Sequence, residues 1–296
     1  MEIRELQYFL AVVEHENISK AAEELFITQP NLSRQMQNLE AELGKKLFVR
    51  GKRKIVLTEA GIQLRKRAEE IVSLVGKAKE ELSATAEHIV GTVEIGGGES
   101  CAVKLIARAA KAVQDQHPQI QFRFFSGDTA DVVERLDQGL LDFGILIEPA
   151  DLTRYECIRL PIADTWGILV RKDSALAEKA YVTPMDLRSS RLIFSKHALG
   201  RNAITEWFQI GVKALNIVAT YNLIYNASLM VEEGMGYAVG LDRLINTSGD
   251  SNLRFIPFAP KLTSNLYVAW KKQFVLSRAD EVFLNELRQT LAQFKG

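Results

Sequence analysis

The spacing of proline constrains this chain more than any other feature of its sequence. No proline lies between Pro30 and Pro118. Because proline interrupts helix interiors, this gap permits long helices. Strand-like apolar runs begin only after about residue 91. The sequence therefore predicts a helical first part, followed by a part in which strands and helices alternate.

The first 44 residues predict three short helices. The first covers about residues 4–14, and its apolar side chains form one stripe at helical spacing: Leu6, Phe9, Leu10 and Val13. Ser19 is the expected N-cap of the second helix and Thr28 of the third, which ends at Gly44. Two short helices with a brief connection indicate a helix-turn-helix. An ordinary helical hairpin fits the same spacing.

The third helix has a polar face that is rich in hydrogen-bond donors and has no acidic residue before Glu40. Asn and Gln side chains can bind adenine through two hydrogen bonds, and Arg can bind guanine in the same way. Such a face favours DNA recognition over packing into a core. The residues expected to contact DNA from this helix and its N-cap are Thr28, Gln29, Asn31, Ser33, Arg34 and Gln35.

A one-signed basic segment follows this helix. Residues 45–54 read KKLFVRGKRK, with six basic residues and no acidic one. Strand-like runs on both sides of Gly51 predict a small hairpin with a charged tip. Runs of charge usually mark a face exposed to solvent. This run adjoins a candidate recognition helix, which favours a hairpin wing that contacts DNA. The wing residues expected to contact DNA are Arg50, Lys52, Arg53 and Lys54.

A long helix is predicted over about residues 58–88. Its apolar residues are spaced alternately by four and three, as in the a/d seam of a coiled coil: Leu64, Ala68, Ile71, Val75, Ala78 and Leu82. The seam either packs on its own domain or meets a partner helix, and its length favours dimerisation. A dimer would present two recognition helices to a two-fold DNA site.

The rest of the chain alternates between strand and helix patterns, which predicts an α/β fold with parallel, doubly wound sheets. Helical patterns cover about 103–113, 132–136 and 278–294. The predicted strands are 93–96, 120–125, 143–147, 166–170, 192–194, 217–221, 237–240, 253–257 and 266–270.

Doubly wound sheets bind ligands beyond the carboxyl ends of their strands, at helix N-termini. Four segments fit this description: 96–101, 126–131, 194–202 and 221–229. Each carries hydroxyl or amide side chains, although plain helix caps explain any single one as well. The candidate ligand-binding residues are Ser100, Thr129, Ser195 and Asn226, with Lys196 as a possible positive charge.

Composition excludes several classes of protein. The chain of 296 residues is 47% hydrophobic and 25% charged, which is typical of globular domains and excludes disorder. Lys+Arg and Asp+Glu are both 37, so net charge implies no partner. No signal or membrane-spanning segment is visible, and we expect a cytoplasmic protein.

The residues that carry chemistry are sparse. The four histidines are scattered, and no spacing fits a metal site, a nucleophile elbow or a phosphate loop. We therefore expect no catalytic residue, metal or cofactor. Two cysteines exclude a disulfide scaffold. Cys101 is expected at a helix N-terminus, where the pKa of a thiol falls, but two packed thiols, Cys101 and Cys157, are favoured over a redox switch.

One ungapped pattern carries a family resemblance. It comprises Ala21-Ala22, Thr28-Gln29-Pro30-Asn31-Leu32-Ser33-Arg34-Gln35, Leu39-Glu40, Leu43-Gly44, Leu47-Phe48-Val49-Arg50 and Leu57-Thr58-Glu59-Ala60-Gly61. This pattern resembles the DNA-binding domain of LysR-type transcriptional regulators, and the rest of the chain fits that family more loosely in length and layout.

The resemblance implies a domain plan. Residues 1–58 would form a winged helix-turn-helix and residues 59–88 a dimerising linker helix. A two-lobed effector domain like that of periplasmic binding proteins would follow, with lobe I at 92–163 and 265–296 and lobe II at 164–264. Family members usually form tetramers as dimers of dimers, bind promoter DNA and respond to small, often anionic, metabolites between the lobes.

The resemblance also implies roles for individual residues. Gln29, Ser33 and Arg34 would face bases, while Arg50 and residues 52–54 would hold the DNA backbone or minor groove. Ser100 and Thr129 match first-lobe effector positions, and Trp166 and Ser195 match second-lobe positions. Oxidative-stress members keep a close cysteine pair in the second lobe, which this sequence lacks because no cysteine follows Cys157.

We therefore expect a sequence-specific DNA-binding transcription regulator that acts as a homodimer or a dimer of dimers. A small, anionic metabolite bound between the lobes would close them and change the spacing of the DNA-binding pairs. The alternative is a cytoplasmic small-molecule-binding protein or enzyme that uses the two-lobed domain, with the helical head as an interaction module.

Overall fold

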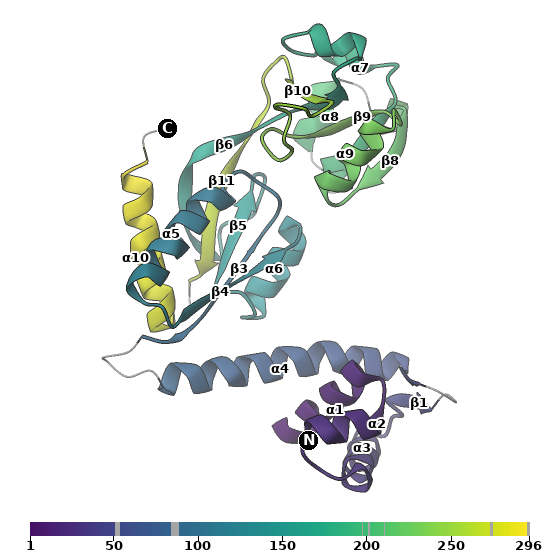
Figure 1. Ribbon diagram of the computed structural model, residues 1–296, viewed down its shortest axis with the longest axis vertical. Coiled ribbons are helices and arrows are strands. Elements are labelled where there is room, and N and C mark those ends of the chain that lie inside the picture. The colour runs from purple at the N-terminus through teal and green to yellow at the C-terminus, as the bar shows by residue number, and fades with distance from the viewer. Residues whose placement is uncertain are drawn as a thin grey trace. The chain divides into compact units, whose positions relative to one another are not determined.

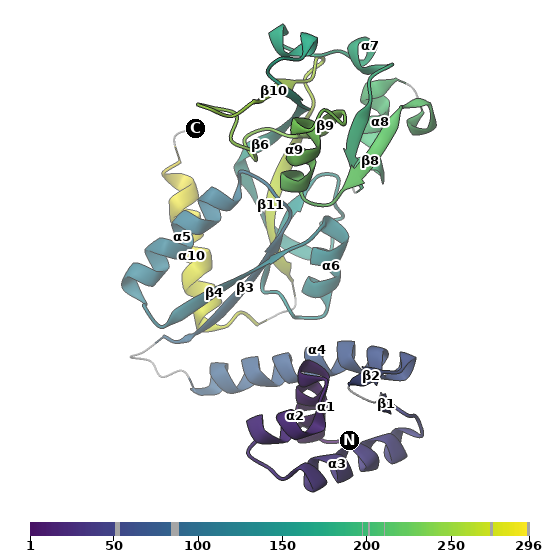
Figure 2. The same ribbon diagram turned by 45° about the vertical axis from the view of Figure 1, so that its right-hand side comes forward.

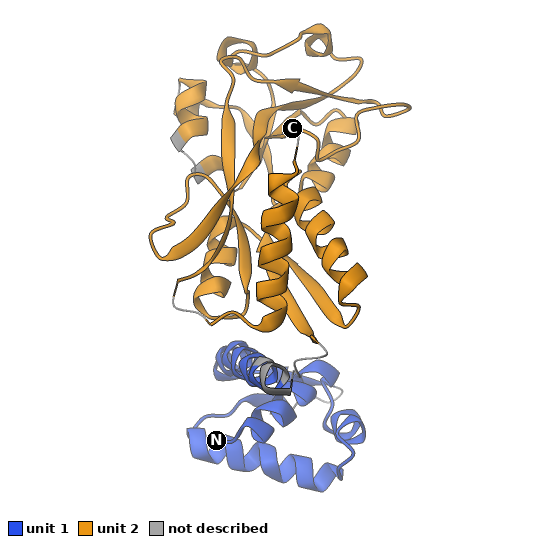
Figure 3. Ribbon diagram, turned by 90° about the vertical axis from the view of Figure 1, so that its left-hand side faces the viewer, with its two compact units in different colours: residues 1–85 blue, residues 86–296 orange. Residues whose placement is uncertain are grey.

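The computed structural model describes residues 1–50, 54–83, 89–196, 198–200, 202–209, 211–272 and 275–294. The chain forms two compact units, residues 1–85 and residues 86–296 (Figure 3). Among the helices described, none is both long and apolar enough to cross a membrane.

Unit 1 contains four helices and a two-stranded hairpin: α1 (Ile3–His15), α2 (Ile18–Glu24), α3 (Gln29–Leu43), β1 (Phe48–Arg50), β2 (Ile55–Leu57) and α4 (Glu59–Ser83). Its core is built on Phe9, Leu32 and Leu39, whose side chains are fully buried. The strands β1 and β2 pair antiparallel, with Phe48 opposite Leu57. The predicted helices and hairpin are thus present, and they form a winged helix-turn-helix.

The N-cap of α2 differs from the prediction. The side chain of Asn17, not that of Ser19, caps the helix, and its oxygen accepts the N–H groups of Ser19 and Lys20 at 2.8 and 3.2 Å. Asn17 has the extended backbone that an N-cap requires, whereas Ser19 lies inside the first turn. Asn and Ser are equally good caps, so the sequence alone does not decide between them.

The predicted seam of α4 divides into two parts. Ala68 is fully buried in the core of unit 1, and Leu64 and Ile71 pack against the same core. Ala78, one turn beyond Val75, is exposed. The alternative of a helix packed on its own domain therefore holds for the first half of the seam. The side chain of Leu82 and residues 84–88 of the predicted helix lie outside the described part of the chain.

Unit 2 is a two-lobed α/β structure, and Figures 1 and 2 show its elements. Its strands are β3 (Gly91–Gly97), β4 (Ile120–Ser126), β5 (Phe143–Ile147), β6 (Tyr155–Arg171), β7 (Leu192–Ser195), β8 (Ile217–Tyr221), β9 (Tyr237–Leu241), β10 (Leu253–Pro257) and β11 (Thr263–Lys271). Its α-helices are α5 (Val103–Gln116), α6 (Thr129–Asp137), α7 (Pro184–Leu187), α8 (Asn202–Phe208), α9 (Ile224–Glu232) and α10 (Arg278–Ala292).

The sheet runs in the order β4-β3-β5-β11-β6-β9-β7-β8, with β10 paired to β6. The α/β class is confirmed, but the sheet is mixed and not parallel throughout. Strand β3 is parallel to β4 and β5, and β7 is parallel to β8 and β9. Strands β6 and β11 pair antiparallel with each other and with their neighbours.

The two long strands β6 and β11 connect the lobes. Strand β6 begins at Tyr155, well before the predicted segment 166–170. Charged residues such as Glu156 and Arg159 interrupt the apolar pattern there, which explains why the sequence did not reveal the whole strand. Asp164 and Ser264, at the predicted lobe boundaries, lie opposite each other in the register of this pair.

Each lobe has its own apolar core. In lobe I, α5 and α10 pack side by side on one face of the sheet and α6 lies on the other (Figures 1 and 2). Phe143 and Phe283 meet edge to face at 5.1 Å in this core. In lobe II, Trp207 stacks on Phe258 with ring centroids 3.8 Å apart.

Candidate DNA-binding surface and effector cavity

Helix α3 separates an apolar face from a polar one. Leu32, Met36 and Leu39 are buried in the core of unit 1. On the other face, Gln29 and Arg34 are exposed. Of the remaining predicted DNA contacts, Thr28 is exposed, whereas Asn31, Ser33 and Gln35 are half-buried. The fold therefore holds this helix firmly by one side and leaves its donors accessible on the other.

The start of α3 suits a DNA surface. Thr28 has the extended backbone of an N-cap, as predicted, but its side chain makes no capping hydrogen bond in the described structure. Pro30 occupies the first turn. Arg34 has no ion-pair partner among the described residues. A helix N-terminus attracts phosphate groups, and an unpaired guanidinium can bind guanine or phosphate without first breaking an internal contact.

The carboxylate of Glu40 holds the wing to the helices, a role that its place in the sequence does not reveal. The Glu40 carboxylate accepts hydrogen bonds from the backbone N–H of Leu47 at 2.9 Å and from the ammonium of Lys46 at 2.6 Å. Burial acts to raise the pKa of Glu40, but these hydrogen bonds lower it below its ordinary value. The only signal in the sequence is an acidic residue just before a basic segment, which is a weak one.

Part of the predicted wing contact set lies beyond what the structure shows. Lys52 and Arg53 lie outside the described residues, and of Arg50 only the backbone in β1 is described. Lys54 is exposed and forms an ion pair with Glu16. The basic charge of Lys54 is therefore partly compensated within unit 1.

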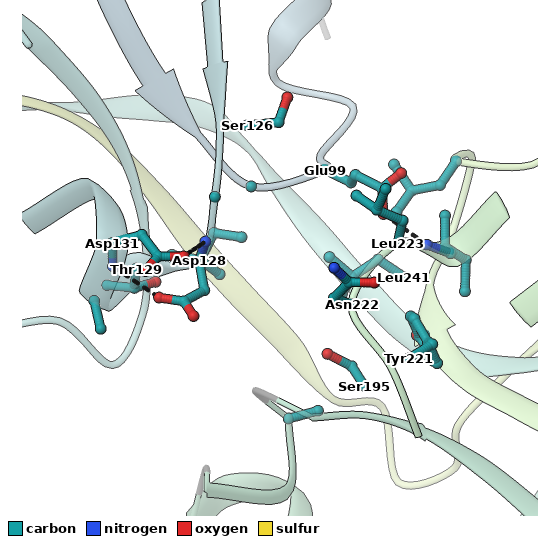
Figure 4. A pocket seen from close by; sticks show the side chains of 18 of the residues that line it. Glu99, Ser126, Asp128, Thr129, Asp131, Ser195, Tyr221, Asn222, Leu223 and Leu241 are labelled. Atoms are coloured by element: carbon teal, nitrogen blue, oxygen red, sulfur yellow. Dashed lines mark hydrogen bonds between the residues drawn. The ribbon is translucent and has the colours of Figure 1, made fainter. Parts of the chain in front are cut away.

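A cavity of about 390 Å³ opens between the two lobes of unit 2. Figure 4 shows Asp128, Thr129 and Asp131 at one side of it, facing Ser195 and Asn222. The lining combines the loop after β3, the start of α6, Trp166 in the second half of β6, the end of β7 and the start of α9. These are the strand ends and helix N-termini at which doubly wound folds bind ligands.

The structure brings together three of the predicted effector residues. Thr129, Trp166 and Ser195 line the cavity. The indole N–H of Trp166 donates to the Ser264 hydroxyl at 3.0 Å, which fixes the ring at the junction of the lobes. Asn222, which was not predicted, lines the cavity where Asn226 was expected.

The other predicted effector residues do not line this cavity. Lys196 and Asn226 are exposed elsewhere, on the β7 end and along α9. Ser100 is 6% exposed, and its hydroxyl oxygen accepts the N–H of Ala102 at 3.0 Å. It therefore serves the turn that leads into α5 and is not the cap of that helix, because the N-cap position is Ala102. Because Lys196 is absent from the lining, the expectation of an anionic effector draws no support from the described residues.

Carboxylates of the chain itself occupy both helix N-termini at the cavity. In α6, Asp128 and Asp131 form a reciprocal capping box within one turn. In α9, Leu223 supplies no capping side chain within the described structure. Glu99 of lobe I accepts the N–H of Ile224 at 2.7 Å in its place, which joins the two lobes across the cavity (Figure 4).

Cys101 does not have the low pKa that its expected position suggested. Helix α5 begins at Val103, so Cys101 lies in the preceding turn, and its thiol donates to Asp164 at 3.3 Å. Burial and the neighbouring carboxylate raise the pKa of this thiol to about 11. Burial also raises the pKa of Asp164, although hydrogen bonds with Ser100 and Cys101 act against that rise. Cys101 is thus protonated at neutral pH, unlike a reactive thiolate. Cys157 is exposed, so the prediction of two packed thiols is wrong for that residue.

Family models match both units of the chain. The model for "Bacterial regulatory helix-turn-helix protein, lysR family" matches residues 3–62, and the model for "LysR substrate binding domain" matches residues 86–292. The second match alone covers more than half of the chain. The boundary between the two matches agrees with the division into two compact units.

Two transcriptional regulators are similar to this chain over most of their length. The uncharacterized HTH-type transcriptional regulator YfeR of Shigella flexneri is 25% identical over 288 residues, which cover 97% of this chain and 93% of YfeR. The DNA-binding transcriptional dual regulator OxyR of Escherichia coli K12 is 29% identical over 214 residues, or 71% of this chain and 70% of OxyR.

Solved structures show the same fold. Full-length CbnR, crystallised with its target DNA, has a TM-score of 0.74 at 21% identity and covers 98% of this chain and 100% of its own. Full-length BenM has a TM-score of 0.55 at 25% identity, with coverage of 99% and 96%. Together with the two family models, these matches establish that the chain belongs to the LysR family of DNA-binding transcription regulators that carry an effector-binding domain.

Proposed function

We propose that this regulator reads a two-fold promoter site as a homodimer through the polar face of α3. The observation that carries the proposal is the division of α3 described above. Its apolar face is buried while Gln29 and Arg34 remain exposed. A helix held in this way can enter the major groove with little rearrangement. Two such helices related by a two-fold axis would read a palindromic site.

The second half of α4 supports the dimer. Ala78 is exposed, and Val75 is only partly buried by unit 1. Continuation of the 4–3 spacing beyond the part that packs into unit 1 leaves a seam for a second copy of α4. Relatives of this family supply the further expectation of a dimer of dimers.

The cavity between the lobes is the proposed effector site. Its size suits a small metabolite, and it has hydroxyl, amide and apolar groups on its walls. An effector that binds both lobes would favour one lobe separation over another. Because the effector would bind one lobe separation more tightly than the other, its binding would shift the protein toward that state and change the spacing of the DNA-binding pairs. We propose that the protein acts in the cytoplasm as a binding protein and not as an enzyme, without a cofactor.

Selection of duplexes from a random pool by the full-length protein tests this function. We expect an enriched two-fold motif with half-sites about one helical turn apart. The selection is run with and without a mixture of metabolites, because DNA binding can require the effector. Failure to enrich any motif under both conditions would contradict the proposal.

A further inference from the structure

The connection between α2 and α3 contains an aromatic side chain that the fold does not use. Phe26 is 95% exposed, more than any other large hydrophobic residue of the described chain. Its neighbours Leu25 and Ile27 both pack against the core of unit 1. Single exposed hydrophobic residues are common on protein surfaces, so exposure alone does not indicate a function.

The backbone of Phe26 adds a second observation. Its φ angle is +54°, in the left-handed region that bulky side chains disfavour. This conformation closes the turn, because the N–H of Ile27 bonds to the carbonyl of Ala22 at 3.0 Å. Glycine adopts it without a steric cost and often occupies this turn. Phe26 thus combines a left-handed backbone with an exposed apolar ring, at a position where glycine would suit the fold better.

The position of Phe26 identifies the partner. It lies two residues before Thr28, the N-cap of α3, and three before Gln29. It is therefore continuous with the DNA-reading surface proposed above. In the major groove, the C5-methyl group of thymine is the apolar feature that distinguishes bases, and phenylalanine can contact it.

We propose that Phe26 is a specificity-determining residue that contacts the methyl group of a thymine in each half-site. This inference rests on the proposed function, because it needs α3 in the major groove. It adds an apolar contact to the hydrogen bonds of Gln29 and Arg34. It also explains why the turn keeps a phenylalanine where its backbone favours glycine.

The test removes single methyl groups from the DNA. A duplex selected by the full-length wild-type protein is resynthesised with deoxyuridine in place of one thymine at a time, in one half-site only. Deoxyuridine keeps every hydrogen bond of thymine and lacks the methyl group. At one position we expect the affinity of the wild type to fall by about fourfold, which is the effect of losing one buried methyl group.

Two variants assign that methyl contact to Phe26. Phe26→Gly should bind the thymine and deoxyuridine duplexes equally, and Phe26→Leu, which keeps an apolar side chain, should retain part of the discrimination. Equal binding of both duplexes by the wild type at every thymine, or unchanged discrimination in Phe26→Gly, would overturn the inference. Either result would leave the proposed function intact, because tight binding of the unsubstituted duplex tests that function separately.

The melting temperature of unit 1 provides a second readout. Glycine relieves the left-handed backbone, so Phe26→Gly should melt at the wild-type temperature or above it. Gln209→Gly replaces another exposed left-handed residue, in unit 2, and should leave DNA binding unchanged. A clear fall in the melting temperature of Phe26→Gly would assign the side chain to the fold and overturn the inference.

Discussion

The two units of this regulator prepare their polar groups for a partner in opposite ways. In unit 1, Gln29 and Arg34 on α3 are exposed, and Arg34 has no ion-pair partner among the described residues. In unit 2, by contrast, carboxylates of the chain already occupy helix N-termini at the cavity: Glu99 that of α9 and Asp128 that of α6.

This difference indicates how each unit responds to its partner. A DNA contact by Arg34 would break no ion pair among the described residues, so this part of the surface is organised in advance. An effector that reaches the N-terminus of α9 has to replace the bond from Glu99, which joins the lobes. Replacement of Glu99 by the effector at the N-terminus of α9 would break the bond between the lobes. Effector binding would thereby be connected to the separation of the lobes.

The largest expected effect separates the two halves of the α4 seam. Ala68→Asp places a charge in the core of unit 1, where Ala68 has no exposed surface. An unpaired buried charge costs several kcal/mol, so we expect unit 1 to unfold while unit 2 melts as before. Thermal unfolding followed by calorimetry measures both transitions.

Ala78→Asp is the matched control, because Ala78 is an exposed alanine of the same helix and the same seam. It should leave the folding of both units unchanged and weaken self-association, measured by sedimentation equilibrium. Equal melting of the Ala68→Asp variant and the wild type would show that the first half of the seam does not belong to the core of unit 1.

A smaller effect is expected at the contact between the lobes. Glu99→Ala removes the acceptor of the Ile224 N–H, and loss of an N-cap costs about 1 kcal/mol of unfolding free energy. Hydrogen exchange of the Ile224 amide should accelerate, because that group loses its partner. Glu99→Gln keeps an acceptor oxygen and should give an intermediate rate.

Asp128→Ala provides the comparison for that contact, since it removes a cap that lies within lobe I. It should lower the stability of unit 2 without changing exchange at Ile224. Unchanged exchange at Ile224 in Glu99→Ala would mean that the bond across the cavity does not form in solution.

The smallest expected effect is a dependence of stability on pH. Burial raises the pKa of Asp164 in the folded protein. Its contribution to stability is therefore greatest below the unfolded pKa of about 4 and falls as pH rises toward the folded value. Asp164→Asn removes this loss, so the variant should gain stability relative to wild type as pH rises.

Asp186→Asn should behave in the opposite way. The Lys179 ammonium lies 2.5 Å from the Asp186 carboxylate and, with the backbone N–H of Thr183, lowers the pKa of Asp186 to about 2. This group stabilises the fold above its unfolded pKa, and the contribution disappears as pH falls toward 2. Denaturant unfolding from pH 3 to pH 7 measures the stability of both variants relative to wild type. If this difference changed in the same direction with pH for both variants, the opposite pKa shifts of Asp164 and Asp186 would be contradicted.

The division of α3 into an apolar and a polar face was predictable because its residues are neighbours in the sequence. Residues 29–35 lie on one helix, and the 3.6-residue period alone divides Leu32 from Gln29 and Arg34. The anchoring role of Glu40 was not predictable, because it depends on the wing folding back against the end of α3.

The effector cavity was harder to predict because its walls come from segments that are far apart in the chain. Each candidate segment offered a hydroxyl or amide side chain, and only the fold decides which one faces the cavity. Ser100 turned inward to a loop, while Ser195 lines the wall. The contact of Glu99 with Ile224 spans 125 residues and two lobes, so no local pattern marks it.

The most direct test of the central claim is a selection from a random duplex pool, run side by side with wild type, Arg34→Ala and Arg65→Ala. Arg65 is an exposed arginine of the same unit, paired with Glu69 on α4. We predict that wild type and Arg65→Ala enrich the same two-fold motif. Arg34→Ala should lose the preference for one base pair in each half-site, with a loss of about 1–3 kcal/mol in affinity. An identical motif for all three proteins would contradict DNA reading through α3.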